Sequence, residues 1–252
     1  MNHSRLLECL AADYSLLRRA ASASDPAAPV PSCPGWSAAD LLTHITAVYL
    51  HKTVTMRTGA YPDPWDPDLS GEPLAVLDAA YGALTAEFAA RPADSPALTW
   101  YEPDQSVGFW IRRMAHESVI HRVDAELAAG LPVTPIPDDL AADGVDEVLT
   151  AFLAYEAAQS PKEFAELEGG HLAGPGGEET IVVRAGEREW TVRPTPTSVR
   201  ITQGGAGNPR AVVAGEPADV LLWMWGRGGS VAVEGDPDWA AYLRRMLVLV
   251  TQ

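Results

Sequence analysis

The chain has 252 residues, of which 47% are hydrophobic, so it can form one large globular domain or two modest ones. Its formal net charge of -16 disfavours binding to nucleic-acid phosphates or to anionic membrane surfaces. Its two cysteines, Cys9 and Cys33, argue against a disulfide scaffold and against a cysteine-based zinc site.

The N-terminal sequence lacks the uninterrupted apolar core of a signal peptide, and no apolar run is long enough for a membrane helix. We therefore expect a cytoplasmic protein that is a monomer or a weak dimer and that binds neither nucleic acid nor membrane.

In the first 158 residues apolar side chains recur at helical spacing, which predicts helices, and proline-rich loops separate these helices. Ser37 and Asp40 form a capping-box pattern at the start of the second helix, which continues to about residue 57. The other helices are expected at about 3–22, 73–91, 106–129 and 137–157. This part of the chain is predicted to be an all-α domain.

After Ser160 short β-like runs replace the helical spacing. Strands are expected around 181–183, 190–192, 199–201, 211–213 and 230–233, and helices at about 217–225 and 237–250. The predicted fold is α+β overall, with an α-helical domain over 1–158 and a small α+β domain over 168–252.

Glu117 and His121 are four residues apart and share one face of the predicted fourth helix. They interrupt an apolar stripe that includes Trp110 and Met114, where a buried charge is costly unless it is compensated. A bound cation would compensate it, but a hydrogen-bonded core pair has the same spacing. His116 points to another face, and the spacing does not match the His-Glu-x-x-His zinc motif.

His44 borders the packed face of the second helix, between Leu41 and Val48. Two helices that meet along such faces can bring His44, Glu117 and His121 to one point. Two imidazoles and one carboxylate suit Zn²⁺ with an open fourth position, although Fe²⁺, Mn²⁺ or Ni²⁺ could occupy the same set.

Three segments resemble the mycothiol-dependent maleylpyruvate isomerase family, whose N-terminal domain is a DinB-like four-helix bundle. They span nearly the whole chain in the family's order. The segments are Val30-Pro31-Ser32-Cys33-Pro34-Gly35-Trp36-Ser37 with the following Asp40-Leu41-Leu42 and His44, then His116-Glu117 with His121-Arg122 and Asp124-Ala125, and finally Gly215-Glu216-Pro217-Ala218-Asp219 through Trp225-Gly226-Arg227 to Glu234-Gly235-Asp236.

The resemblance implies that His44, Glu117 and His121 hold the metal, for which this ligand set favours Zn²⁺, and that mycothiol is the thiol cosubstrate. It also implies a small sterol-carrier-like C-terminal domain in which Arg227 lies near the active site. From the residues alone, Arg227 in its glycine-rich surroundings is either a carboxylate clamp or a solvated loop residue.

Three functions are therefore compared. The first is a thiol-dependent isomerase or S-transferase in which a metal-bound thiol attacks an electrophilic small molecule. The second is a hydrolase that activates water on the same metal, and no further base is evident for it. The third is a non-catalytic binding protein, which the intact ligand set disfavours.

The roles of three neighbouring residues stay open at this stage. Asp124 lies three residues after His121, so it could orient that ligand, pair with Arg122 or cap a nearby segment of the chain. Cys33 precedes a helix and is interpreted as part of a structural turn. No role is assigned to His116, and the tryptophans are expected in the core.

Overall fold

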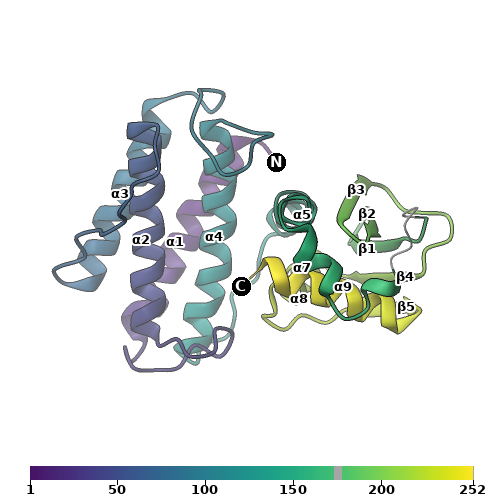
Figure 1. Ribbon diagram of the computed structural model, residues 1–252. Helices are drawn as coiled ribbons and strands as arrows, with labels where there is room; N and C mark the ends of the chain where they lie inside the picture. Colours follow the sequence, from purple (N-terminus) through teal and green to yellow (C-terminus); the bar gives the residue numbers. More distant parts are fainter. Residues whose placement is uncertain (173–177, 252) are drawn as a thin grey trace. The chain divides into compact units, whose positions relative to one another are not determined.

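The computed structural model describes residues 1–172 and 178–251, and its internal contacts divide the chain into the units Met1–Thr134 and Pro135–Gln252. The first unit is helical, and the second combines helices with one sheet (Figure 1). Both agree with the predicted combination of a four-helix bundle and an α+β domain.

The first unit contains four long helices, which are α1 His3–Ala23, α2 Ala38–Thr58, α3 Pro73–Ala90 and α4 Val107–Ala128. Helix α1 packs along α4, and α2 packs against both α3 and α4. Helices α2 and α4 are therefore neighbours, which is the arrangement that a metal site between them requires.

Side-chain caps fix the starts of these helices. The predicted capping box is present, since Ser37 accepts from the backbone N–H of Asp40 while the Asp40 carboxylate accepts from the N–H of Ser37. Ser106 caps α4 in the same way through the N–H of Phe109. Gly59 ends α2 with a φ of 68°, a left-handed conformation that favours glycine.

Helix α4 lies deep in the first unit, and its buried residues include Trp110, Met114 and Val119. Ile45 and Tyr49 of α2 are also completely buried. The predicted apolar stripe of α4 is thus confirmed as core, and Trp110 belongs to it.

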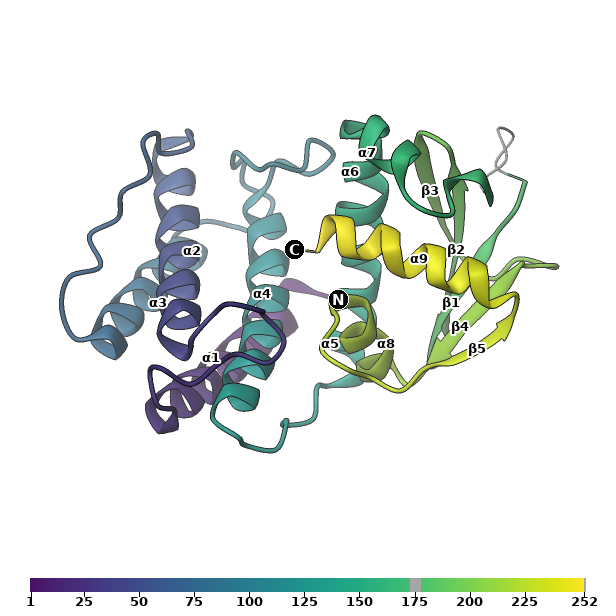
Figure 2. The same ribbon diagram turned by 60° about the horizontal axis from the view of Figure 1, so that its bottom comes forward.

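The second unit contains the helical segments α5 Asp138–Glu147, η1 Val148–Ala154, α6 Tyr155–Gln159, α7 Pro161–Glu166, η2 Gly170–Leu172, α8 Pro217–Trp225 and α9 Pro237–Val250. Its strands are β1 Ile181–Ala185, β2 Arg188–Thr195, β3 Ser198–Gln203, β4 Ala211–Gly215 and β5 Ala232–Gly235. Figure 2 shows α9 running across the sheet.

The five strands follow the order β3-β2-β1-β4-β5, and only the β1–β4 pair is parallel. Helices α8 and α9 both contact β1 and β4. The central strands β1 and β4 therefore carry the core of the sheet, where Ile181 and Val183 of β1 lie opposite Ala211 and Val213 of β4.

The boundary between the units differs from the expected one. The sequence placed residues 137–157 in the helical domain, whereas the contacts group this segment with the sheet. Helix α5 packs against α8, and the Asp146 carboxylate accepts from the indole N–H of Trp190 at 2.8 Å. An apolar helical face indicates that a helix packs, but it does not indicate which partner it packs against.

Smaller differences concern the elements themselves. The fifth helix is interrupted by the π-helical η1, the short helix α7 follows it, and the last strand begins at Ala232 instead of residue 230. No helix among the described residues is long and apolar enough to cross a membrane.

Candidate metal centre

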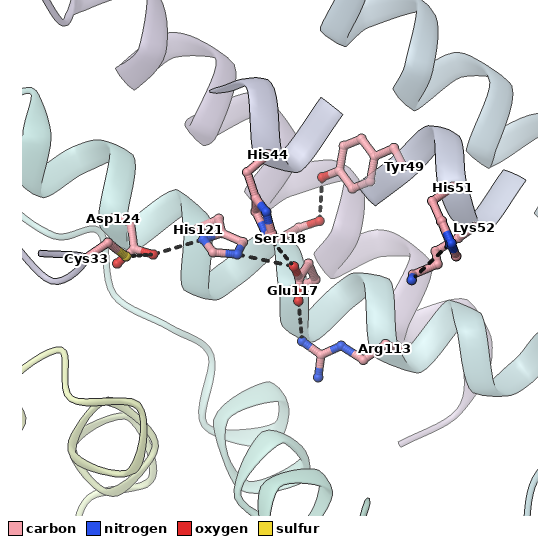
Figure 3. A network of polar contacts seen from close by, with 10 residues as sticks. All are labelled: Cys33, His44, Tyr49, His51, Lys52, Arg113, Glu117, Ser118, His121 and Asp124. Carbon is pink, nitrogen blue, oxygen red and sulfur yellow. Dashed lines mark hydrogen bonds and ion pairs between the residues drawn. The ribbon is translucent and has the colours of Figure 1, made fainter. Parts of the chain in front are cut away.

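The three candidate ligands of the first unit converge on one point. His44 extends from α2, and its Nε2 atom lies 3.4 Å from Oε1 of Glu117 on α4. His121, one turn further along α4, places its own Nε2 atom 3.2 Å from the same oxygen. The ligand atoms of all three residues lie within 4.8 Å of one another (Figure 3).

Asp124 orients His121 through the ring nitrogen Nδ1, while the other nitrogen, Nε2, faces Glu117. Its Oδ2 atom lies 2.9 Å from Nδ1 of His121, and Asp124 is completely buried. With the proton on Nδ1, the lone pair of Nε2 points toward Glu117, which is the arrangement that a metal-binding histidine needs. Among the roles considered for Asp124, the structure therefore shows the contact with His121.

The loop before α2 holds Asp124 in turn. The hydroxyl of Ser32 donates to Oδ1 of Asp124 at 2.5 Å, and Sγ of Cys33 lies 3.7 Å from Oδ2. Cys33 is thus part of a structural turn, as expected. Through Asp124, this turn also supports the candidate ligand His121.

The electrostatics of the cluster match a site for a cation. Burial alone would lower the pKa of His121, but Glu117 and Asp124 outweigh it and raise the pKa to about 9. Burial alone would raise the pKa of Glu117, yet His121, His44 and Arg113 hold it well below the usual range. Glu117 is consequently a carboxylate whose charge attracts either a proton on His121 or a cation between the two.

Arg113 fixes the other oxygen of Glu117. Its guanidinium donates to Oε2 at 2.8 Å, so Oε1 remains the oxygen that faces both histidines. The side chain of Arg113 is only 4% exposed. The spacing of four residues between Arg113 and Glu117 on one helix is the feature of the sequence that indicates this contact.

The site is more open on the side of α2. The His44 side chain is 36% exposed, against 17% for Glu117 and 11% for His121. The ring of Trp36 contacts His44 edge-on, with a centroid separation of 4.9 Å. Trp36 is therefore a wall of the candidate site, although the sequence indicated only a core residue.

Arg227 lies in the second unit, directly after α8. Its backbone N–H donates to the carbonyl of Leu222 at 2.8 Å, and its guanidinium donates to the carbonyl of Trp225 at 2.7 Å. The guanidinium also lies 5.8 Å from the centre of the Trp225 ring. Arg227 is thus held in place by the helix end and does not sit on a freely flexible glycine loop.

Two family models match the chain. The mycothiol maleylpyruvate isomerase N-terminal domain matches residues 7–126, and the corresponding C-terminal domain matches residues 139–241. The chain belongs to the mycothiol-dependent maleylpyruvate isomerase family. The expected membership is confirmed, and all three candidate ligands lie within the N-terminal match.

Solved structures show the same fold. A crystal structure of a histidine-to-alanine variant of the mycothiol-dependent maleylpyruvate isomerase matches with a TM-score of 0.59 at 16% identity, covering 93% of each chain. A second crystal structure of that enzyme gives a TM-score of 0.55 at 17% identity, again covering 93% of each chain. No match was found among curated proteins.

Proposed function

We propose that this member of the family is an enzyme that holds one divalent cation, Zn²⁺, with His44, Glu117 and His121. In this proposal the enzyme uses a low-molecular-weight thiol, mycothiol, as the nucleophile on an electrophilic small molecule. The observation that carries the proposal is the convergence of three ligand atoms within 4.8 Å in the domain that the family model matches.

The residues fit a zinc ion in number and in chemistry. Two imidazole nitrogens and one carboxylate oxygen are the ligands of many open zinc sites, which keep a fourth position for an exogenous ligand. The lone pairs of His121 Nε2 and Glu117 Oε1 face each other at 3.2 Å, which is unfavourable unless a proton or a cation lies between them.

When bound, such a cation lowers the pKa of a coordinated thiol so that it is a thiolate at neutral pH. The protein residues contribute orientation. Asp124 holds His121 in one tautomer, and Arg113 holds Glu117 through the oxygen that faces away from the histidines. These contacts keep the ligand set in place before any substrate arrives.

The reaction outcome depends on the adduct between thiol and electrophile. Addition of the thiolate to a conjugated carbon–carbon double bond forms a C–S bond and makes the former double bond rotatable. Expulsion of the thiolate after rotation gives cis–trans isomerisation, whereas protonation of the adduct gives an S-conjugate. In either reaction we propose that Arg227 binds a carboxylate of the thiol or the substrate through its guanidinium fork.

The test combines metal content with thiol dependence. Purified protein should contain about one divalent ion per chain, and His44→Ala, Glu117→Ala and His121→Ala should each lose most of it. His51→Ala, seven residues after His44 on the same helix, is the matched control and should retain the ion. Maleylpyruvate should then be converted by wild-type protein only when mycothiol is present.

Three outcomes would contradict parts of this proposal. Full metal retention in all three alanine variants would exclude the site. Turnover without any thiol would favour activation of water by the same ion. A protein that holds the ion but leaves maleylpyruvate unchanged in the presence of mycothiol would exclude that compound as the electrophile, and other conjugated acids would be assayed by the same method.

A further inference from the structure

Lys52 on α2 is a half-buried cation close to the candidate metal centre. Its Nζ atom lies 3.3 Å from Nδ1 of His51 and 5.0 Å from the centre of the Trp110 ring. Among the described residues, no carboxylate lies within 4.0 Å of it. An ammonium group in such surroundings lacks the anion that ordinarily compensates a charge removed from water.

The negative charge that acts on Lys52 is that of Glu117. Burial and Arg113 lower the pKa of Lys52, and Glu117 raises it, so the three groups interact electrostatically. Glu117 already accepts from Arg113 and faces both histidines. In Figure 3, Arg113 and Lys52 lie on the side of Glu117 that is opposite to His121 and Asp124.

A divalent cation changes the charge balance of this cluster. Its two positive charges offset the carboxylates of Glu117 and Asp124, so neither remains to neutralise Arg113 or Lys52. Arg113 already donates to Glu117, and Lys52 then adds a further positive charge beside the ion. A surplus charge in partly buried surroundings attracts an anion more strongly than the same charge in water.

Aromatic side chains contact Lys52 and its neighbour His51. Trp110 lies under the ammonium group. The ring of His51 contacts Trp65 edge-on with a centroid separation of 5.0 Å, and it stacks on Tyr61 at 6.0 Å. Burial and Lys52 lower the pKa of His51 to about 4, so His51 is neutral at pH 7. The ammonium group is thus a positive charge in contact with aromatic side chains, and Glu117 and Arg113 are the charged groups that act on it.

We propose that Lys52, supported by Trp110, forms a carboxylate-binding subsite beside the metal and selects small molecules that carry a carboxylate. This proposal rests on the proposed function, because it assumes a divalent ion on His44, Glu117 and His121. The carboxylate could belong to the thiol or to the electrophile, and the chemistry that recognises it is the same. All the residues of the subsite belong to the first unit.

The first arm of the test places the carboxylate on the thiol. Protein loaded with Co²⁺ is titrated with mercaptoacetate, 3-mercaptopropionate and 4-mercaptobutyrate, and with their amides, while the sulfur-to-cobalt absorption band is followed. At least one acid should bind about tenfold more tightly than its amide, as expected for one charge-assisted contact. Lys52→Met should reduce this preference to about twofold or less, and Lys52→Arg should retain most of it.

The second arm places the carboxylate on a second ligand. Protein loaded with Co²⁺ and saturated with mycothiol is titrated with succinate and with succinamide by calorimetry. A preference for succinate that Lys52→Met removes assigns the subsite to the electrophile, and a preference seen only in the first arm assigns it to the thiol. Lys162→Met removes the same charge from an exposed position and is the control in both arms.

Two results separate the possible failures. If acids and amides bind equally, or if Lys52→Met leaves the preference of both arms intact while the protein keeps its cobalt, the subsite is wrong and the metal site stands. If no thiol produces the sulfur-to-cobalt band, the proposed thiol chemistry is wrong, and the Lys52 dependence of succinate binding still decides the subsite.

Discussion

Helix α4 of the first unit buries seven polar or charged side chains, whereas the strands of the second unit bury an almost entirely apolar set in which Thr191 is the polar member among the described residues. Burial of a charge lowers stability unless a partner compensates it, so α4 needs a network of contacts that the sheet does not. The sheet is stabilised by apolar packing, while α4 combines packing with a site that can hold a cation.

The largest expected effect on stability comes from removing a buried charge of the α4 network. Arg122 is completely buried, forms ion pairs with Asp13 at 3.0 Å and Glu126 at 2.8 Å, and donates to the carbonyl of Thr134. Arg122→Ala leaves the two carboxylates buried without this partner and should lower the free energy of unfolding by about 3–5 kcal/mol. Urea unfolding of the metal-free protein measures the change.

An exposed ion pair of the sheet provides the control for that variant. Arg184 pairs with Glu189 at 2.6 Å, and its side chain is 41% exposed. Arg184→Ala should change the free energy of unfolding by about 0–1 kcal/mol. Equal losses in the two variants would show that the buried network of α4 has no special weight in stability.

A smaller effect, on metal affinity, is expected from a substitution of Asp124, which contacts the candidate ligand His121. Asp124→Asn keeps the shape of the side chain but removes the charge that orients His121, so metal affinity should fall about 10–100-fold. Competition with a chromophoric chelator measures this affinity. Asp146→Asn, which changes a carboxylate of the second unit, should leave metal affinity unaltered, and an equal fall in both variants would contradict the assigned role of Asp124.

The smallest expected effect is a change in catalysis caused by a substitution at Arg227 of the second unit. Arg227→Lys keeps the positive charge but loses the planar fork, and we expect kcat/KM to fall about tenfold while the metal content stays that of the wild type. Steady-state kinetics with mycothiol, together with metal analysis, test this expectation. Arg184→Lys is the matched control in the same unit. Unchanged kinetics in Arg227→Lys would remove Arg227 from the proposed site.

Part of this site could be predicted from sequence because it depends on local geometry. The spacing of Glu117 and His121 places them on one helical face whatever the tertiary fold. His44 lies on another helix, so the face argument made it a candidate, and the family motif selected the same residue. The capping box at Ser37 could be predicted because it, too, depends only on residues close together in the sequence.

The features that were missed depend on distances between helices. Nothing in the spacing of α2 and α4 indicates that the ammonium group of Lys52 lies over Trp110 or that Trp36 contacts His44. The fifth helix was assigned to the wrong neighbour by sequence for a similar reason, since its apolar face fits either core and the contacts group it with the sheet.

The origin of the ligands on α2 and α4 also has a thermodynamic consequence. These helices are separated in sequence by the whole of α3 and two loops, so an ion that bridges them acts as a reversible cross-link in the folded chain. An ion that binds the folded chain and not the unfolded one stabilises it in proportion to the logarithm of the free metal concentration. With the proposed ion bound, the melting temperature of the protein should therefore rise with the free metal concentration, and removal of the metal should lower it.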